Sequence, residues 1–414
     1  MKASFKQLAG RYRAKKGEHM KVVQINAVYP RGSTGYIVQA IDTILKQNDI
    51  ESWIAYADGP DPWENGIRIG SGIDHKAHAL LSHVLGKQGY FSTYATKKLI
   101  ERLKAIGPDV VHLHNLHHNY INIELLFSYL SENHIKTVFT LHDCWFFTGK
   151  CTHFQVAKCN NWITGCHSCP QLLADNPSWF FDNTKKAWEH KAALYRSLHS
   201  AHVVGASYWI SDLARHSILK SLPISTIHNG IDTKVFAREG DNLRRKLNIE
   251  NKYIVLTMAN KMLNPENRGL LEHLANRLPE DVILLLLGAD FTAKKSIGIS
   301  AVQTSEEMAR IYRTADVFLN VSHEDTLPTV NLESMACGTP VVSYSVCGCT
   351  ETMGENTGVL VRENDWDALV KAILEVRKLG KGFYSKHCID HIAENYEYQK
   401  CFTQYLRIYK GEVV

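Results

Sequence analysis

The sequence predicts an α/β protein built from two doubly wound domains that face each other across a cleft. Three observations lead to this fold class. Short runs rich in β-branched residues alternate with helical patterns from residue 20 onward. The same alternation restarts after Asn229-Gly230, and one doubly wound domain rarely exceeds about 250 residues. With 414 residues, 45% of them hydrophobic and 21% charged, the chain can fill a core in each domain.

The first Rossmann-like domain is expected over residues 20–228. Its first strand is 21–28 (KVVQINAV), followed by a turn at Gly32-Ser33-Thr34-Gly35 and an amphipathic helix through Gln47. Three more runs are expected to be buried strands: 109–113, 137–141 and 202–206. Short apolar strands separated by helices of about ten or more residues indicate parallel sheets made of βαβ units.

The second Rossmann-like domain is expected over residues 229–392, after a junction near 227–232 where a turn dipeptide follows a strand. Its expected strands are 254–259, 282–288, 297–302, 317–321 and 341–344. Residues 393–414 carry aromatic side chains at helical spacing and are expected to form a helix. Two such domains leave a cleft at the carboxyl ends of both sheets, where α/β folds bind ligands.

The net charge of +5 resides in the first 19 residues, which hold six Lys or Arg and one acid. Residues 20–414 are neutral, so we expect no nucleic-acid partner. The basic segment lacks the apolar core of a secretory signal. We expect it to be a disordered extension, or the product of a start codon upstream of a true start at Met20. Contact with anionic lipid is a further use for it.

Residues 325–342 (DTLPTVNLESMACGTPVV) are the most informative segment. A short helix is expected to begin near Pro328 and to end at Gly338, which favours a helix stop. The amino end of this helix directs free amides into the cleft, where they can bind a phosphate. Glu333 lies one to two turns into the helix, where its carboxylate could accept two ribose hydroxyls. Asp325, in the preceding loop, could bind a sugar hydroxyl.

An acid, seven residues and a Glu, followed by Ser-Met-Ala-Cys-Gly-Thr-Pro-Val-Val, closely resembles the donor site of glycosyltransferase family 4, whose fold is GT-B. The family usually has Glu where this chain has Asp325. The resemblance implies an acceptor-binding first domain, a nucleotide-sugar-binding second domain, and a last helix that crosses back to the first domain. It also implies that Asp325 contacts the transferred sugar and that Thr326, Leu327 and Glu333 bind the donor.

The resemblance extends to two cations and a glycine. Lys261 follows strand 254–259 and Arg268 opens the next helix, whereas the family has Arg and then Lys at these positions to hold the donor diphosphate. Two cations stabilise a diphosphate leaving group without a metal; a solvated helix start is the alternative interpretation. In the first domain, Gly35 is the position at which the family lets the backbone approach the donor phosphates.

Histidines gather after two strands of the first domain. His142 ends strand 137–141 in a Thr-Leu-His-Asp segment, and the resemblance implies that it contacts the transferred sugar; the alternative is a buried, hydrogen-bonded imidazole. Four more histidines cluster nearby, at His112, His114, His117 and His118. They could line the acceptor pocket, pack in the core or bind a metal, although no partner carboxylate or thiolate is visible nearby.

Ten cysteines without a signal peptide suggest a reducing cytoplasm. Four of them lie in an expected loop at 144–170: Cys151, Cys159, Cys166 and Cys169. Four thiolates are the number that a closed tetrahedral zinc site requires, so we expect a possible structural zinc beside the acceptor cleft. A disulfide-capable loop and four packed thiols are the alternatives. The surrounding residues resemble a subset of family 4 that includes colanic-acid and other exopolysaccharide enzymes.

The resemblance implies a retaining glycosyltransferase that moves a sugar from a UDP- or GDP-sugar to a hydroxyl of a glycan or polyprenyl-linked acceptor in bacterial surface polysaccharide biosynthesis. It requires no catalytic cofactor and places the enzyme in the cytoplasm, with a peripheral contact at the inner membrane. A nucleotide-sugar epimerase of the same fold and a non-catalytic nucleotide-sugar binder are the alternatives. A nicotinamide-dependent dehydrogenase is disfavoured because the dinucleotide fingerprint is missing.

Overall fold

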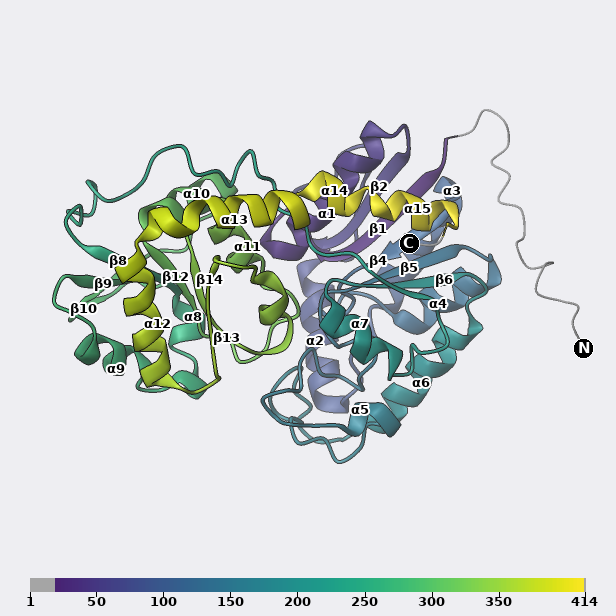
Figure 1. Ribbon diagram of the computed structural model, residues 1–414. Coiled ribbons are helices and arrows are strands. Elements are labelled where there is room, and N and C mark those ends of the chain that lie inside the picture. Colours follow the sequence, from purple (N-terminus) through teal and green to yellow (C-terminus); the bar gives the residue numbers. More distant parts are fainter. Residues whose placement is uncertain (1–18, 413–414) are drawn as a thin grey trace, which may run out of the picture.

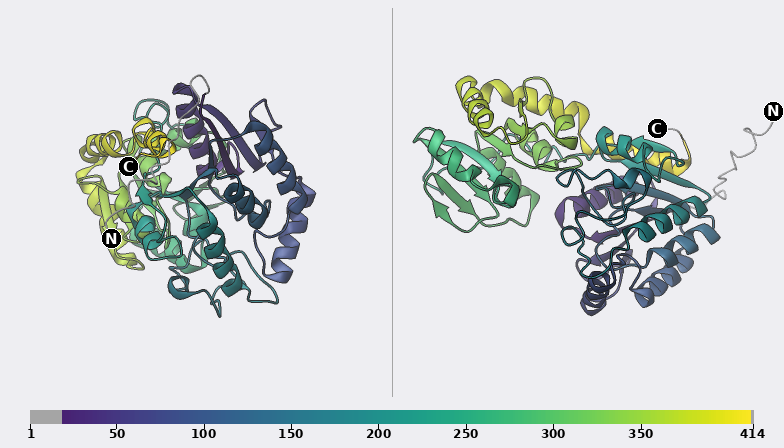
Figure 2. Two further views of the ribbon diagram at one scale, coloured as in Figure 1. Left: turned by 90° about the vertical axis from the view of Figure 1, so that its right-hand side faces the viewer. Right: turned by 90° about the horizontal axis from the view of Figure 1, so that it is seen from below.

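The computed structural model describes residues 19–412, which form two lobes joined by two crossing segments (Figure 1). The expected extension at 1–19 lies outside the described residues except for its last member. Each lobe has a central sheet with helices on both faces, and the right-hand view of Figure 2 shows the lobes apart on either side of a narrow connection. The predicted fold class is therefore confirmed.

The N-terminal domain contains a seven-stranded parallel sheet in the described residues, in the order β3-β2-β1-β4-β5-β6-β7. Its strands are β1 (Lys21–Val28), β2 (Glu51–Asp58), β3 (Gly66–Arg68), β4 (Val110–Leu113), β5 (Lys136–Leu141), β6 (Ala201–Gly205) and β7 (Ile224–Thr226). Its helices are α1 (Gly32–Gln47), α2 (Gly72–Leu85), α3 (Thr93–Ile106), α4 (Ile123–Glu132), α5 (Asn161–Thr164), α6 (Thr184–Ser197) and α7 (Tyr208–Arg215). The order reverses between β1 and β4, which opens a crevice beyond their carboxyl ends.

The second sheet has seven strands within the described chain, in the order β10-β11-β9-β8-β12-β13-β14, and only the β10–β11 pair is antiparallel. Its strands are β8 (Tyr253–Met258), β9 (Val282–Leu287), β10 (Thr292–Ala293), β11 (Ser296–Ile299), β12 (Val317–Asn320), β13 (Val341–Tyr344) and β14 (Gly358–Val361). Its helices are α8 (Ala259–Met262), η1 (Pro265–Asn267), α9 (Leu270–Arg277), α10 (Ser305–Thr314), α11 (Thr329–Ala336), η2 (Cys347–Thr352), α12 (Trp366–Leu379) and α13 (Lys381–Asn395).

Two details of the expected elements are corrected. The segment Gly32-Ser33-Thr34-Gly35 is the first turn of α1 and not a turn before the helix, because the helix begins at Gly32. The strand expected at 297–302 ends at Ile299, where its pairing with β9 ends. No strand was predicted at β2, although its sequence ESWIAYAD alternates in part. This strand pairs with β1, with Lys21 opposite Glu51.

The chain crosses between the lobes twice, and the two crossings lie side by side. The backbone N–H of Ile231 donates to the Tyr396 carbonyl at 2.7 Å, and the N–H of Tyr398 donates back to Ile231 at 3.1 Å. A Cβ at Gly230 would lie 2.3 Å from the Tyr398 Cα, so only glycine permits this approach. The final helices, α14 (Tyr398–Phe402) and α15 (Gln404–Lys410), then pack on the N-terminal domain (Figure 1).

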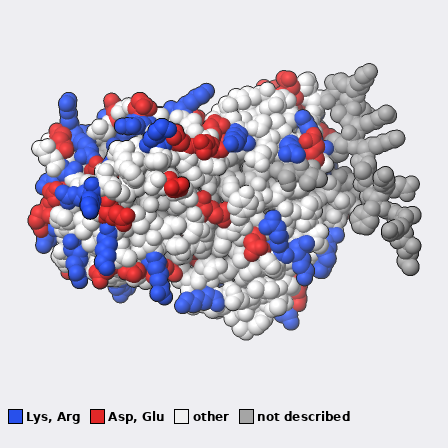
Figure 3. All heavy atoms as spheres, in the orientation of Figure 1, with Lys and Arg blue, Asp and Glu red and all other residues white. Residues whose placement is uncertain are grey.

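The surface carries mixed charge. On the face drawn in Figure 3, Lys and Arg side chains are interspersed with Asp and Glu, most densely over the C-terminal domain. Among residues 19–412, no helix combines the length and the apolar character that crossing a bilayer requires.

Candidate functional site

Two adjoining cavities lie between the lobes, at the carboxyl ends of the strands of both sheets. The larger, of about 600 Å³, contains Glu333, and the smaller measures about 240 Å³. Ser33 and Ile37 of α1 and Thr329 of α11 line both, so the two cavities form one cleft. The smaller cavity brings together residues predicted for the sugar and the diphosphate: His142, Lys261, Asp325, Thr326 and Leu327. Their combined size suits a small-molecule ligand.

Asp325 lies in the loop before α11, at the smaller cavity. The backbone amides of Thr326 and Leu327 lie close enough to its carboxylate to favour the charged form. Burial raises the pKa of Asp325, while the nearby Lys261 ammonium and these two amides oppose the rise. The N–H of Gly348 donates to the Asp325 carbonyl at 3.0 Å and holds the loop in place. The amides of Thr326 and Leu327, predicted to meet the donor, therefore lie beside the Asp325 carboxylate at the smaller cavity.

Glu333 lies in the second turn of α11 and opens into the larger cavity. The hydroxyl of Tyr312 donates to its Oε2 at 2.9 Å. Burial raises the pKa of the Glu333 carboxyl, and the hydrogen bonds from Tyr312 and Thr329 oppose that rise. The helix ends at Ala336, and Gly338, whose φ of 70° is in the left-handed region, follows its Cys337 cap. The carboxylate is thus held in a fixed position by its neighbours.

The two predicted cations occupy different surroundings. Lys261 lies in the short helix α8 after β8, is partly buried and lines the smaller cavity. Arg268 is exposed and is not among the residues that line either cavity. Between them stands η1, which the Asn267 side chain fixes by donating to the carbonyls of Lys261 and Val321, both at 2.9 Å. The structure therefore brings Lys261 to the site and leaves Arg268 at the surface.

Gly35 is also set back from the cavities. It is buried in α1, where an added Cβ would lie 3.1 Å from the carbonyl carbon of Pro30. Its small size lets α1 pack against the chain that leaves β1. Ser33 and Thr34, two residues and one residue earlier, line the smaller cavity in its place.

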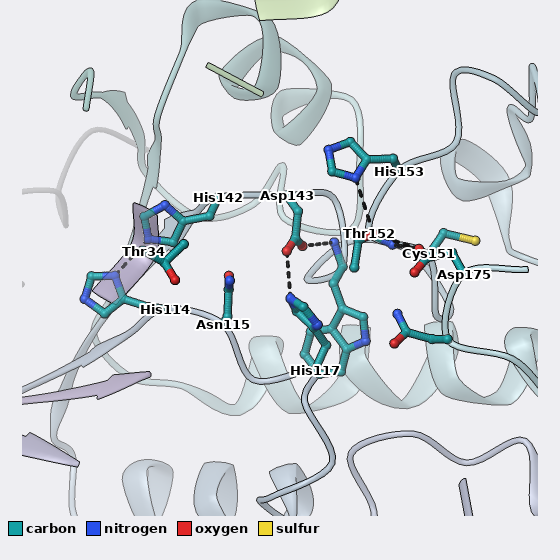
Figure 4. Close-up of polar contacts among 12 residues, drawn as sticks. Thr34, His114, Asn115, His117, His142, Asp143, Cys151, Thr152, His153 and Asp175 are labelled. Atoms are coloured by element: carbon teal, nitrogen blue, oxygen red, sulfur yellow. Dashed lines mark hydrogen bonds and ion pairs between the residues drawn. The ribbon is translucent and has the colours of Figure 1, made fainter. Parts of the chain in front are cut away.

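His142 faces the smaller cavity from the N-terminal domain (Figure 4). Its Nε2 lies 3.0 Å from Nδ1 of His114, and Nε2 of His114 lies 3.3 Å from Oε1 of Gln24. Burial lowers the pKa of His142 to about 4, so the ring is neutral near pH 7. A neutral imidazole in this position can exchange hydrogen bonds with a sugar without adding a positive charge.

The four clustered histidines do not share one role. His112 is fully buried, with Nε2 2.7 Å from the Thr140 hydroxyl and Nδ1 2.7 Å from the Tyr409 hydroxyl, so it fastens α15 to the first sheet. His117 Nε2 lies 2.8 Å from Oδ2 of Asp143. Burial would raise the pKa of Asp143, but His117 and the Trp145 amide lower it to about 2. Sequence reasoning missed this pair, since only the fold joins residues 26 positions apart.

Two glutamates of the C-terminal domain bind backbone amides of the N-terminal domain, and sequence reasoning missed both contacts. The Glu324 carboxylate accepts from the N–H groups of Gln155, at 2.9 Å, and Val156, at 3.2 Å. Glu351 accepts from the first two amides of α7, at 2.7 and 2.5 Å, and so caps that helix from across the lobes. Glu324 precedes the sugar-binding candidate Asp325, so one contact joins the cysteine loop (residues 144–170) to the donor site.

The four cysteines of the loop line one small cavity as free thiols. Cys151 and Cys169 share a hydrogen bond, which raises the pKa of Cys151 and lowers that of Cys169 to about 7. The N–H of Gly149 donates to the Cys166 sulfur at 3.1 Å. The donor types suit zinc, but in the part of the chain that the structure describes no three His, Cys, Asp or Glu side chains are arranged to hold a metal ion.

Comparison with known proteins gives matches over both lobes. A family model described as "Glycosyltransferase Family 4" matches residues 43–235, and one described as "Glycosyl transferases group 1" matches residues 268–378. The putative colanic acid biosynthesis glycosyl transferase WcaC of Escherichia coli is 24% identical over 279 residues, which is 65% of this chain and 67% of that protein.

Two solved structures show the same fold. Sucrose-phosphate synthase from Thermosynechococcus elongatus superposes with a TM-score of 0.68 at 17% identity, over 95% of this chain and 99% of that one. HepE from Anabaena, solved in complex with UDP and glucose, superposes with a TM-score of 0.64 at 14% identity, over 95% of this chain and 100% of the other.

Proposed function

We propose that this chain, which is a GT-B glycosyltransferase with the predicted resemblance to family 4, transfers a sugar from a nucleoside diphosphate to an acceptor hydroxyl. The acceptor is a glycan or a polyprenyl-linked saccharide in bacterial surface polysaccharide biosynthesis. One observation carries the proposal: the interlobe cleft combines the loop that precedes helix α11, a lysine and two partly buried acids. The structure of HepE in complex with UDP and glucose supports a nucleotide-sugar donor. The similarity to WcaC, named as a colanic acid biosynthesis enzyme, supports the role in surface polysaccharide synthesis.

The donor would lie along the two adjoining cavities. Glu333 would accept the ribose hydroxyls in the larger cavity, and Lys261 would face the diphosphate in the smaller one. Asp325 and His142 would bind the sugar from opposite lobes. The Thr326 and Leu327 amides would bind a phosphate oxygen, while the Asp325 carboxylate beside them contacts the sugar.

The reaction would retain the configuration at the anomeric carbon. A double displacement needs a carboxylate nucleophile on the face of the sugar opposite the leaving group, and the acids of this cleft have other partners. In a front-face displacement, the bond from the anomeric carbon to the diphosphate oxygen breaks as the bond to the acceptor oxygen forms. The departing oxygen takes the acceptor proton. Lys261 and the loop amides stabilise the charge on the diphosphate.

A panel of UDP- and GDP-sugars tests this function. Slow donor hydrolysis or transfer to a saccharide acceptor, with retention read by NMR of the product anomer, is the expected result. Epimerisation at C2 of the donor sugar would instead identify an epimerase. Tight binding without turnover for every donor and acceptor would indicate a non-catalytic binder. An inverted product would leave a transferase but contradict the proposed mechanism.

We further propose that the enzyme works in the cytoplasm at the inner membrane, because a polyprenyl-linked acceptor is anchored there. The catalytic steps need no cofactor, since Lys261 and backbone amides supply the positive charge that a metal would otherwise provide. Activity that survives exhaustive chelation is the expected result. Loss of turnover that Mg²⁺ or Mn²⁺ restores would contradict a metal-independent reaction.

A structural zinc in the cysteine loop stays a separate proposal. The loop would have to draw Cys159 and Cys166 toward the bonded pair Cys151 and Cys169 to form four ligands. Metal analysis of freshly purified protein tests it, with close to one equivalent expected. Less than half an equivalent would contradict it, and the thiols would then be packing residues.

A further inference from the structure

Helix α2 exposes most of its large apolar side chains, and the residues that it buries are polar. Its buried residues are His78 and Ser82. In contrast, Ile73, Leu80 and Leu81 are 82%, 55% and 42% exposed. Their spacing of seven and eight residues places them on one stripe of the helix. A surface helix of a protein that stays in water has the reverse arrangement, so this stripe indicates a contact with something apolar.

The inverted orientation of α2 is fixed by hydrogen bonds. His78 Nδ1 lies 2.7 Å from the Ser92 hydroxyl, and the His78 ring meets the Phe91 ring edge-on at 5.4 Å. At the amino end, Ser71 and Asp74 form a reciprocal capping box. A rotation that buried the leucines would break these contacts, so the apolar stripe is a built feature of the helix.

An aromatic segment extends this stripe. Trp179, Phe180 and Phe181 are 49%, 70% and 52% exposed. The Trp179 N–H donates to the His83 carbonyl at 2.7 Å, and the Trp179 and His83 rings are 5.3 Å apart, which joins the segment to the carboxyl end of α2. We call the combined surface the α2 face. It consists of Ile73, Leu80, Leu81, Trp179, Phe180 and Phe181.

Exposed cations surround the α2 face. Lys98, whose ammonium stacks on the ring of Tyr94, lies near Asp74 at the amino end of α2. At the carboxyl end, Asn183 donates to the Leu85 carbonyl at 2.7 Å and so brings the start of α6 close. The exposed lysines on or beside the face are Lys76, Lys87, Lys98, Lys185 and Lys186. Two nearby acids, Asp74 and Asp182, are engaged as helix-cap and loop acceptors, whereas Glu101 lies near Lys98 and offsets part of its charge.

We propose that the α2 face docks the N-terminal domain on an anionic lipid bilayer. Leucines and aromatic rings enter the interface between headgroups and acyl chains, while lysines at the margin meet anionic headgroups. A second copy of the chain fits less well, because a two-fold pairing of this face would set lysines against lysines. The proposal deepens the proposed membrane contact and rests on the proposed function for its purpose, which is to bring the cleft to a lipid-linked acceptor.

Cosedimentation of the full chain with lipid vesicles tests the docking. The vesicles contain phosphatidylcholine with about one third phosphatidylglycerol, and the chain should bind them more tightly than pure phosphatidylcholine vesicles. The double variant Leu80→Ser, Phe180→Ser should lower the affinity at least about tenfold, because both side chains leave water only on the bilayer. A matched control, Leu379→Ser with Phe383→Ser, removes side chains of 48% and 45% exposure from the C-terminal domain and should bind as the parent does.

Donor hydrolysis in solution without vesicles separates this proposal from the proposed function. All variants should hydrolyse the donor at the parent rate, since the α2 face lines neither cavity of the cleft. Equal loss of vesicle binding in both double variants, or no binding by the parent, would overturn the docking and leave the transferase assignment intact. A second copy of the chain would be the partner if the parent is dimeric, does not bind vesicles and becomes monomeric with Leu80→Ser, Phe180→Ser. That result would overturn the docking proposal.

Discussion

The two walls of the cleft are built in different ways. In the C-terminal domain, the acids and amides assigned to the donor lie within nine consecutive residues, from Asp325 to Glu333, on one loop and the helix that follows. In the N-terminal domain, His142 reaches its position through His114, 28 residues away, and His114 contacts Gln24, 90 residues away. The first wall is a local structure, and the second exists only when the whole sheet has formed.

The two walls should therefore respond differently to amino-acid substitution. A local loop and helix can hold a charged ligand with few partners, so single substitutions there should abolish binding and leave the fold intact. The wall made by β1, β4 and β5 depends on buried polar contacts between strands, so its substitutions and its titration should affect folding as well.

Removing the carboxylate of Glu333 should have the largest effect. Glu333→Gln keeps the size and one acceptor oxygen but loses the charge-assisted pair of bonds to the ribose, and kcat/KM should fall by about 10²- to 10³-fold. Steady-state kinetics with the preferred nucleotide-sugar measures it. Glu306→Gln, an exposed acid at the rim of the same cavity, is the matched control and should be within about twofold of the parent. Equal activity of Glu333→Gln and parent would remove the basis of the donor assignment.

Substitutions of the two predicted cations, Lys261 and Arg268, should lower kcat to different extents. Lys261→Ala should lower kcat about 100-fold by removing the ammonium that faces the diphosphate. Arg268→Ala should lower it only a few-fold, because this side chain is exposed in the structure. If Arg268→Ala matched Lys261→Ala, the η1 segment would have to close on the donor, and the family pattern of two cations would hold here too.

The fold was predictable because its signals are local and repeated. Apolar runs such as 282–287 and 341–344 pair with helical stretches that bury one stripe, and the restart after residue 229 follows from domain size. The ends of α11 were also predictable, since Pro328 and Gly338 have conformational preferences that act within a few residues. The short edge strands β3 and β7 carry too few residues to give such a signal.

The rest of the site could not be predicted, because it depends on partners distant in sequence. The pairing of His117 with Asp143 and the approach of Glu324 to Gln155 join segments that only the tertiary fold brings together. Arg268 stands at the second cation position of the family pattern, but its side chain is exposed and lines neither cavity. The orientation of α2 was equally hidden, since its apolar stripe would ordinarily be assigned to the core.

Mild acid should destabilise the N-terminal domain before the C-terminal one. Burial lowers the pKa of several imidazoles in the first lobe: to about 4 for His118, His142 and His202, and to about 3 for His78. These rings stay neutral when folded but take up protons near pH 6.5 once unfolded. Their contribution to stability is therefore present above pH 6.5 and is lost as pH falls toward 4, by up to about 1.4 kcal/mol per pH unit for a fully shifted group.

Two acids of the C-terminal domain have the opposite effect on the stability of their lobe as the pH falls. Burial raises the pKa values of Asp325 and Glu333, so protonation in mild acid favours the folded state of that lobe. Hydrogen exchange between pH 6.5 and 4.5, corrected for the intrinsic exchange rate, measures both lobes in one sample. As the pH falls, the protection of backbone amides from exchange should decrease first in β4 and β5 and should persist in β8 and β12. A simultaneous loss in both sheets would show that the lobes unfold as one unit.

The smallest effect is expected where the two walls meet, at Glu324. Glu324→Gln keeps an acceptor for one of the Gln155 and Val156 amides but removes the charge, so the contact between the cysteine loop and the donor loop weakens by about 1 kcal/mol. Because Asp325 follows directly, the sugar should be held less firmly, and KM for the donor should rise about threefold to tenfold with little change in Tm. Glu355→Gln, an exposed acid of the same domain, is the control. A change confined to kcat would instead assign Glu324 a direct part in the transfer step.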